Sequence, residues 1–120
     1  MDLLINISIV ILLAFFLVNK FMPVKGVRQI STSDLRKELK RSNVQFIDVR
    51  TSGEFSRNKI NTFKNIPLHE LSQKAKQLSK EKEVVVICQS GMRSNKATKQ
   101  LRKIGFQKIT NVKGGMSAWN

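Results

Sequence analysis

The distribution of apolar positions divides the chain into two parts. Residues 3–22 read LLINISIVILLAFFLVNKFM, an almost unbroken apolar run, whereas the remainder alternates short apolar and polar stretches. A helix of that length measures about 30 Å, roughly the thickness of the hydrocarbon layer of a bilayer. The run has no polar face, which argues against a helix buried in a soluble core. The pattern therefore predicts a membrane-spanning helix over residues 3–22.

A secretion signal is the alternative, because the strictly apolar centre of the run, residues 9–18, is short. Asp2 stands where a signal carries basic residues, and no small-x-small cleavage pattern precedes Pro23, so we expect an uncleaved anchor. Basic residues follow the run and only an acid precedes it, which places the N-terminus outside and residues 25–120 in the cytoplasm. We therefore expect a single-pass protein of the cell membrane, with an anchor and short linker over 1–24 and one domain over 25–120.

The rest of the chain predicts alternating strands and helices. Residues 84–87 are four consecutive β-branched residues, typical of a strand covered on both faces in a parallel sheet. Ser31 and Asp34 fit a capping box at a helix start, and Gly105 is well placed to end another helix. Strands are predicted over 44–49, 63–68, 84–88 and 108–112, and helices from Ser31, over 69–80 and over 94–105. This alternation predicts an α/β fold, an open parallel sheet flanked by helices on both faces.

The charge of the chain is strongly positive. Formal net charge is +14, and residues 25–120 alone carry the same excess. Such a charge favours contact with anionic surfaces: acidic lipid, acidic proteins or nucleic acid. Phe and basic residues do not interleave as a stacking platform for nucleic acid requires, so no nucleic-acid partner is expected. The bases of 94–104 form either a solvated helix side or a face that guides anions; they are Lys96, Lys99, Arg102 and Lys103.

Cys88 is the only cysteine, and it ends the predicted strand 84–88. One cysteine and one histidine, His69, are too few for a four-ligand zinc site, so we expect no metal, and we expect no cofactor. An unpaired thiol suits a reducing compartment or a thiol kept for its reactivity. In open parallel sheets ligands bind outside the carboxyl ends of the strands, which is where Cys88 stands.

The loop after Cys88 has the features of an anion cradle. If the loop curls, its backbone N–H groups point inward, and Gly91 permits the tight step that this needs. The following helix contributes its positive N-terminal end, and Arg93 contributes a charge that can hold an oxyanion through two hydrogen bonds. These surroundings favour thiolate over thiol, whereas a lone cysteine after an apolar strand is otherwise most often a plain buried residue. The spacing Cys-x4-Arg is one residue shorter than the Cys-x5-Arg of cysteine-dependent phosphatases, which favours smaller sulfur-bound anions over a phosphoryl group.

Four motifs resemble those of the rhodanese-like single-domain sulfurtransferases, in the same order along residues 28–120. IDVRTSGEF (47–55) is similar to the family's Asp-Val-Arg-x-x-x-Glu-Phe signature, and NIPLHEL (65–71) to its Asn-Ile-Pro segment. CQSGMRS (88–94) resembles the family's active loop, and GGMSAW (114–119) its Gly-Gly-x-x-x-Trp ending. The chain departs from the family at Asn58-Lys59-Ile60, where Gly-His-Ile is usual, and at Gln89, where many relatives carry Arg.

The resemblance implies two-stage covalent catalysis of sulfur transfer. Cys88 attacks the sulfane sulfur of a small anionic donor such as thiosulfate, and an external thiol or protein acceptor then takes that sulfur from the Cys88 persulfide. The resemblance also implies that loop residues bind the donor, and that an aspartate and an Arg–Glu pair brace the loops. The donor-binding residues are Gln89, Ser90, Gly91, Met92, Arg93 and Ser94, and the bracing residues are Asp48, Arg50 and Glu54. The alternative is a non-catalytic rhodanese-like module that recruits an acidic partner at the membrane.

Overall fold

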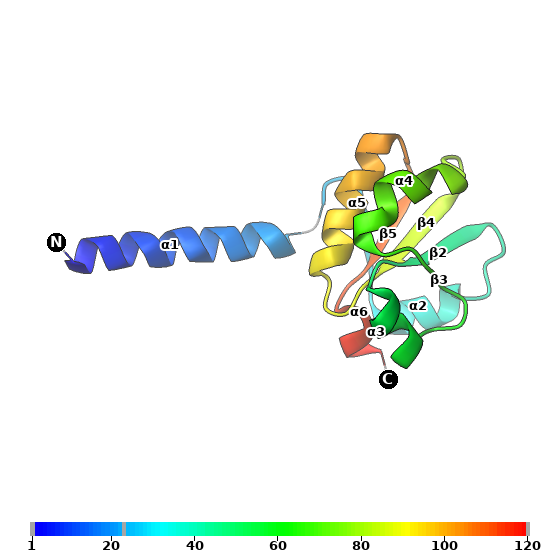
Figure 1. Ribbon diagram of the computed structural model, residues 1–120, viewed down its shortest axis with the longest axis horizontal. Helices are drawn as coiled ribbons and strands as arrows, with labels where there is room; N and C mark the ends of the chain where they lie inside the picture. Colours follow the sequence, from blue (N-terminus) through cyan, green and yellow to red (C-terminus); the bar gives the residue numbers. More distant parts are fainter. Residues whose placement is uncertain (1, 23, 120) are drawn as a thin grey trace.

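The computed structural model describes residues 2–22 and 24–119, and the described chain has two parts (Figure 1). Helix α1 (Asp2–Phe21) extends away from the other elements, which gather into one domain. In chain order the domain contains β1 (Arg28–Ile30), α2 (Thr32–Glu38), β2 (Val44–Asp48), α3 (Ser52–Arg57), β3 (Lys64–Asn65), η1 (Leu68–Glu70), α4 (Leu71–Lys74), η2 (Ala75–Gln77), β4 (Glu83–Ile87), α5 (Met92–Ile104), β5 (Ile109–Val112) and α6 (Gly115–Ala118). The η elements are single turns of 3₁₀ helix.

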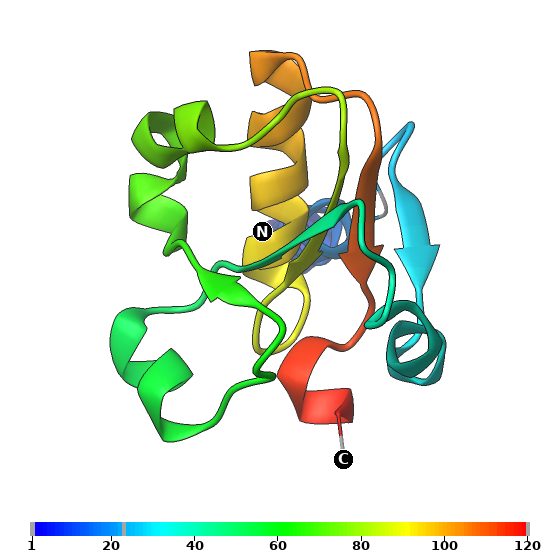
Figure 2. The same ribbon diagram turned by 90° about the vertical axis from the view of Figure 1, so that its right-hand side faces the viewer.

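The sheet is open and parallel, with the spatial order β1-β5-β4-β2-β3 (Figure 2). β4 lies at its centre and pairs with β2 on one side and β5 on the other. A central strand covered on both faces has no polar side, which explains the apolar run 84–87. The parallel sheet expected from the alternation of strands and helices is confirmed.

Helices cover both faces of the sheet, because successive residues of a strand point to opposite sides. Val86 belongs to a core that also contains Leu71 of α4 and Leu101 of α5. The next residue of β4, Ile87, belongs to a second core that contains Leu35 of α2. Cys88 follows on the face of the first core, with α5. The α/β fold class predicted from the sequence is therefore confirmed.

Three elements were absent from the pattern-based expectation: β1, α3 and α6. None of the residues of α3 is buried, so this helix lacks the apolar spacing by which an amphipathic helix is recognised. Its start is instead fixed by reciprocal capping between Thr51 and Glu54. The capping box predicted from Ser31 and Asp34 is confirmed at the start of α2.

Several predicted boundaries are wrong. The single helix expected over 69–80 is divided into η1, α4 and η2, since i→i+3 bonds replace i→i+4 bonds at both ends. The strand expected over 63–68 shortens to two residues, because Pro67 has no N–H for the ladder. The helix expected from Ser94 begins at Met92, and Gly105 ends it in the left-handed conformation, as predicted.

Helix α1 is long and apolar enough, by length and composition, to cross a membrane, and none of the stretch Asp2–Asn19 is buried against the domain. The domain meets the end of α1 through α5. The Nδ2 of Asn95 donates a hydrogen bond to the carbonyl oxygen of Met22 at 2.7 Å. The N-terminal turn of α5 is thereby joined to the end of the apolar helix.

Candidate active site

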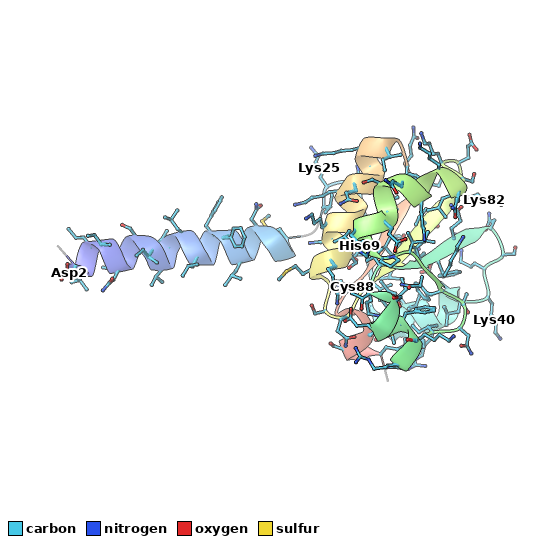
Figure 3. The ribbon with its side chains drawn as sticks, viewed as in Figure 1. Asp2, Lys25, Lys40, His69, Lys82 and Cys88 are labelled. Atoms are coloured by element: carbon cyan, nitrogen blue, oxygen red, sulfur yellow. The ribbon has the colours of Figure 1, made fainter. Side chains whose placement is uncertain are left out.

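Cys88 lies directly after β4, within the domain beside the start of α5 (Figure 3). Its side chain is fully buried, with 0% of its surface exposed. The Sγ accepts a hydrogen bond from the backbone N–H of Gly91 at 3.0 Å and lies 3.3 Å from the Oγ of Ser94. The Gly91 N–H therefore donates to the sulfur, while the thiol donates to the hydroxyl oxygen of Ser94, so two polar groups contact Sγ.

The loop that surrounds this sulfur is short. Gly91 has φ +110, in the left-handed region, and caps α5, so Met92, Arg93 and Ser94 already belong to the first turn of the helix. The left-handed step turns the N–H of Gly91 back toward Cys88, which a side chain at this position would make costly. Only Cys88, Gln89, Ser90 and Gly91 lie between β4 and α5.

The C-terminal turn, residues 114–119, contacts the loop through two backbone hydrogen bonds. The N–H of Met116 donates to the carbonyl oxygen of Cys88 at 2.8 Å, and the N–H of Ser117 donates to that of Gln89 at 2.9 Å. These bonds hold both carbonyls away from the sulfur. Gly115 approaches the loop so closely that a Cβ on it would lie 2.2 Å from the oxygen of Cys88. The GGMSAW motif thus packs directly against the backbone of Cys88 and Gln89 and forms what we call the floor of the loop. The sequence of the motif alone does not reveal this role.

Asp48 and Arg50 form a buried ion pair beside the loop. Their side chains are 1% and 2% exposed, and the Nη2 of Arg50 lies 2.8 Å from the Oδ2 of Asp48. Arg50 also donates to the carbonyl oxygen of Asn58 and, at 3.4 Å, to that of Glu54. A single guanidinium thereby joins the end of β2 to α3 and to the segment after it.

The second ion pair joins Glu54 of α3 to Arg93 of α5. Both Nη atoms of Arg93 reach the carboxylate of Glu54, at 2.6 and 2.9 Å. The hydrogen bond from Arg93, helped by Thr51, lowers the pKa of Glu54 to about 2, although partial burial opposes the shift. The pairing differs from the expected Arg–Glu brace, because Asp48 takes Arg50 and leaves Glu54 to Arg93.

Two hollows flank the loop. A groove of about 560 Å³ runs along α5 and has Met92 and Arg93 at one end. A smaller hollow of about 230 Å³ includes Ser90 and Gly91 in its lining. Cys88 lines neither hollow, so a reagent reaches its sulfur only after the loop moves.

Two further residues lie apart from the loop. His69 is exposed, and its side chain faces Glu70, as expected of a surface residue. Trp119 packs against the core around Leu35 and lies under the guanidinium of Arg36, so it closes the last turn of the chain. Neither residue contacts Cys88 in the hydrogen bonds of the described chain.

Comparisons with known proteins identify relatives of this chain in sequence and in structure. Residues 31–120 match the Rhodanese-like domain. The chain is 38% identical over 94 residues to a putative sulfurtransferase, YtwF, of Bacillus subtilis, an alignment that covers 78% of this chain and 90% of the relative. An uncharacterized protein, YqhL, of the same organism is 32% identical over 116 residues, covering 95% and 92%.

Among solved structures, a rhodanese-like domain protein from Staphylococcus aureus superposes with a TM-score of 0.72 at 33% identity, covering 78% of this chain and 92% of that one. Residues 31–120, which match the family, carry the Cys88 loop and the two ion pairs described above. The parallel sheet, the cysteine loop and the matched sequence agree with one another, and the chain belongs to the rhodanese-like family.

Proposed function

We propose that the chain is a sulfurtransferase in which Cys88 carries the transferred sulfur. In the first half-reaction the thiolate of Cys88 attacks the sulfane sulfur of a donor such as thiosulfate. A bond forms between the two sulfur atoms, the sulfur–sulfur bond of the donor breaks, and sulfite leaves with that bonding pair. The product on the protein is a Cys88 persulfide.

In the second half-reaction an external nucleophile removes the outer sulfur. Cyanide or a thiolate attacks that atom, the bond to Cys88 breaks, and its electron pair returns to Cys88 as thiolate. The chain has no second cysteine that could resolve the persulfide internally. The acceptor is therefore a separate molecule, a small thiol or a protein thiol.

The observation that carries this proposal is the pair of polar groups at Sγ: the Gly91 N–H, which donates to it, and the Ser94 hydroxyl, whose oxygen accepts from the thiol. Both are suited to negative charge on sulfur, and both lie at the N-terminal end of α5, where the helix dipole also favours an anion. In the described structure the Ser94 hydroxyl donates to the carbonyl oxygen of Gly91 at 3.2 Å. A small rotation of this hydroxyl transfers its hydrogen bond to the thiolate or to the outer sulfur.

The buried state of Cys88 requires an opening step. Ser90 is exposed and Gly91 carries no side chain, so these residues of the loop are the ones that can swing away from the sulfur. The incoming anion then meets backbone N–H groups from Gln89 to Ser94. Arg93 attracts it at longer range, in competition with the carboxylate of Glu54.

The test is sulfur loading and cyanolysis by the full chain in non-ionic detergent. Thiosulfate should add the mass of one sulfur atom to the peptide that contains Cys88, and cyanide should then release thiocyanate. Cys88→Ser should lose both signals, whereas Ser56→Ala, an exposed change in α3, should keep them. Equal thiocyanate production by wild type and Cys88→Ser would rule out the proposed role.

The alternative proposal is a non-catalytic module that recruits an acidic partner. It is favoured by the complete burial of Cys88 and by the net charge of +14. The same experiment separates the two, since a module without activity gives no persulfide on Cys88 even with excess thiosulfate.

For location, we propose that α1 anchors the protein in the cell membrane, with the N-terminus outside and the domain in the cytoplasm. Support comes from the length and apolar composition of α1 and from the bases that follow it, including Lys25 and Arg28. Protease added to intact spheroplasts should leave the domain whole. Digestion of the domain without lysis would reverse the orientation.

A further inference from the structure

Beyond the sulfur loop, α5 is the element of the domain that contacts the end of α1. Figure 1 shows α5 running across the direction of α1, on the side of the domain that faces it. Two hydrogen bonds fix this placement: Asn95 Nδ2 donates to Met22 O at 2.7 Å, and Arg102 Nη1 donates to Gly26 O at 3.4 Å. Where α1 enters a bilayer, α5 therefore lies at the headgroup level.

The groove along α5 is basic. Lys96, Lys99 and Lys103 lie on one face of the helix, three and four residues apart, and all are exposed. No ion pair of the described residues includes any of them. Residues 84–120 contain no Asp or Glu at all, so the helix has no acidic neighbour in its own part of the chain.

Two arginines outside the groove are paired with carboxylates. Arg28 and Arg41 are each paired with both Glu38 and Glu83, at N–O distances of 2.6 to 2.9 Å. Figure 3 shows Lys40 and Lys82 at the side of the domain remote from α1. The three groove lysines thus differ from these arginines in having no carboxylate partner among the described ion pairs, and from Lys40 and Lys82 in lying on the helix next to α1.

The shape of the groove suits a lipid headgroup. Its volume is about 560 Å³, and its lining combines the three lysines and Gln100 with the apolar side chains of Leu68 and Met92. Met92 is 39% exposed, although it is apolar. Lysine ammonium groups hold a phosphodiester, while apolar walls and lysine stems accept the glycerol and the upper acyl carbons.

We propose that this groove binds the phosphate groups of anionic lipids in the membrane that α1 enters, so that the domain lies flat against the bilayer along α5. The occupant is a lipid rather than an acidic protein because α1 brings a headgroup layer to this surface in any case. Anionic leaflets attract basic segments within about 8 Å of the surface at physiological salt. The inference rests on α1 as a membrane anchor and is independent of sulfur transfer.

The test uses the full chain in proteoliposomes and measures lysine acylation by a water-soluble N-hydroxysuccinimide ester, residue by residue, by mass spectrometry. Vesicles contain phosphatidylcholine alone or phosphatidylcholine with phosphatidylglycerol. Phosphatidylglycerol should slow acylation of Lys96, Lys99 and Lys103 by roughly threefold or more, because each ammonium is held at the anionic surface. Lys40 and Lys82 serve as internal references and should change little.

Two double variants test whether the groove lysines themselves hold the lipid. Lys99→Gln/Lys103→Gln should remove most of the protection of Lys96, whereas Lys40→Gln/Lys82→Gln should leave it in place. Salt of about 1 M should abolish the effect, because it shortens the Debye length to about 3 Å. Inorganic phosphate added to phosphatidylcholine vesicles should give no protection.

Three results would overturn the proposal. Equal slowing at all five lysines would show attraction by net charge without a docking surface. No slowing at the three groove lysines would show that the groove stays in solvent. Protection by inorganic phosphate alone, equal to that by phosphatidylglycerol, would identify a site for a free anion. Since none of these readouts involves thiosulfate, a failed lipid test leaves the sulfurtransferase proposal to its own experiment.

Discussion

Gly115→Ala is the substitution by which the floor of the sulfur loop is best tested. A Cβ at this position would lie 2.2 Å from the oxygen and 2.9 Å from the carbonyl carbon of Cys88. Both contacts are to backbone, which cannot rotate out of the way. The loop and the C-terminal turn would have to separate, and the hydrogen bond from Met116 N to Cys88 O would lengthen.

The expected cost has two parts. Gly115 has φ +55, a left-handed conformation that costs a residue with a Cβ roughly 1 kcal/mol. Overpacking against fixed backbone costs about 1 to 3 kcal/mol more. We therefore expect the free energy of unfolding to fall by about 2 to 4 kcal/mol, and the rate of sulfur transfer to fall as the loop moves away from its hydrogen bonds. Gly53→Ala is the matched control: a Cβ there has nothing within 4 Å, and Gly53 lies within a helix.

The assay is urea unfolding of the full chain in non-ionic detergent, followed by the fluorescence of Trp119. This residue is the only tryptophan, and it lies in the domain, so the signal reports the domain and is insensitive to α1. Gly53→Ala should be neutral or stabilising by roughly 0.5 kcal/mol. If Gly115→Ala proved as stable as Gly53→Ala and kept full cyanolysis, the proposed floor of the loop would be refuted.

The remaining predictions concern the two ion pairs and the Ser94 hydroxyl. Asp48→Asn leaves the buried guanidinium of Arg50 without a counter-charge and should lower the free energy of unfolding by about 3 to 5 kcal/mol, measured by urea unfolding. Glu54→Gln should lower stability at neutral pH, but the difference from wild type should shrink as the pH falls from about 4.5 toward 2, because the folded pKa of Glu54 is held at about 2. Ser94→Ala should slow alkylation of Cys88 by iodoacetamide at pH 7 and lower the rate of cyanolysis several-fold, by about 1 kcal/mol of lost hydrogen bonding.

The predictions for Asp48→Asn, Glu54→Gln and Ser94→Ala each have their own control or contrary outcome. For Asp48→Asn the control is Asp34→Asn, an exposed change at the start of α2, and equal costs would show that the Asp48 pair is not needed. For Glu54→Gln the test is the direction of the pH dependence. The Glu54 carboxylate stabilises the fold above pH about 4.5, so the stability difference between wild type and variant should shrink in acid. A difference that grows in acid would contradict the ion pair with Arg93. For Ser94 an unchanged alkylation rate would show that its hydroxyl does not act on the sulfur.

Much of the fold could be predicted from the sequence because its strongest signals are local. The apolar run 84–87 indicated a buried central strand, and the position of Cys88 at the end of that run indicated the edge of the sheet where ligands bind. Helix α5 was recognisable from Ala97, Leu101 and Ile104 together with Gly105. Elements without such spacing were not predicted, because α3 buries no residue and α6 is only four residues long.

The candidate site was less predictable because its contacts join distant parts of the chain. Arg93 could be expected to carry charge into the loop, but its partner Glu54 lies 39 residues earlier, and nothing local excludes Arg50 as the partner of Glu54. The complete burial of Cys88 depends on how closely the loop folds around it, which spacing alone does not fix. The hydrogen bond from Asn95 to the end of α1 had no signal in the sequence, since an asparagine in a first helical turn is most often a solvated residue.

For the proposed sulfurtransferase, the enclosure of Cys88 sets a compromise between turnover and storage. Peroxides, free thiols and the sulfur donor would all reach the buried Cys88 only when the loop opens. A loop that opens often loads and unloads sulfur quickly but exposes the outer sulfur atom to scavengers. A loop that opens seldom would keep a bound sulfur atom intact for longer, so under the proposed function the opening frequency decides between rapid sulfur exchange and storage of reactive sulfur.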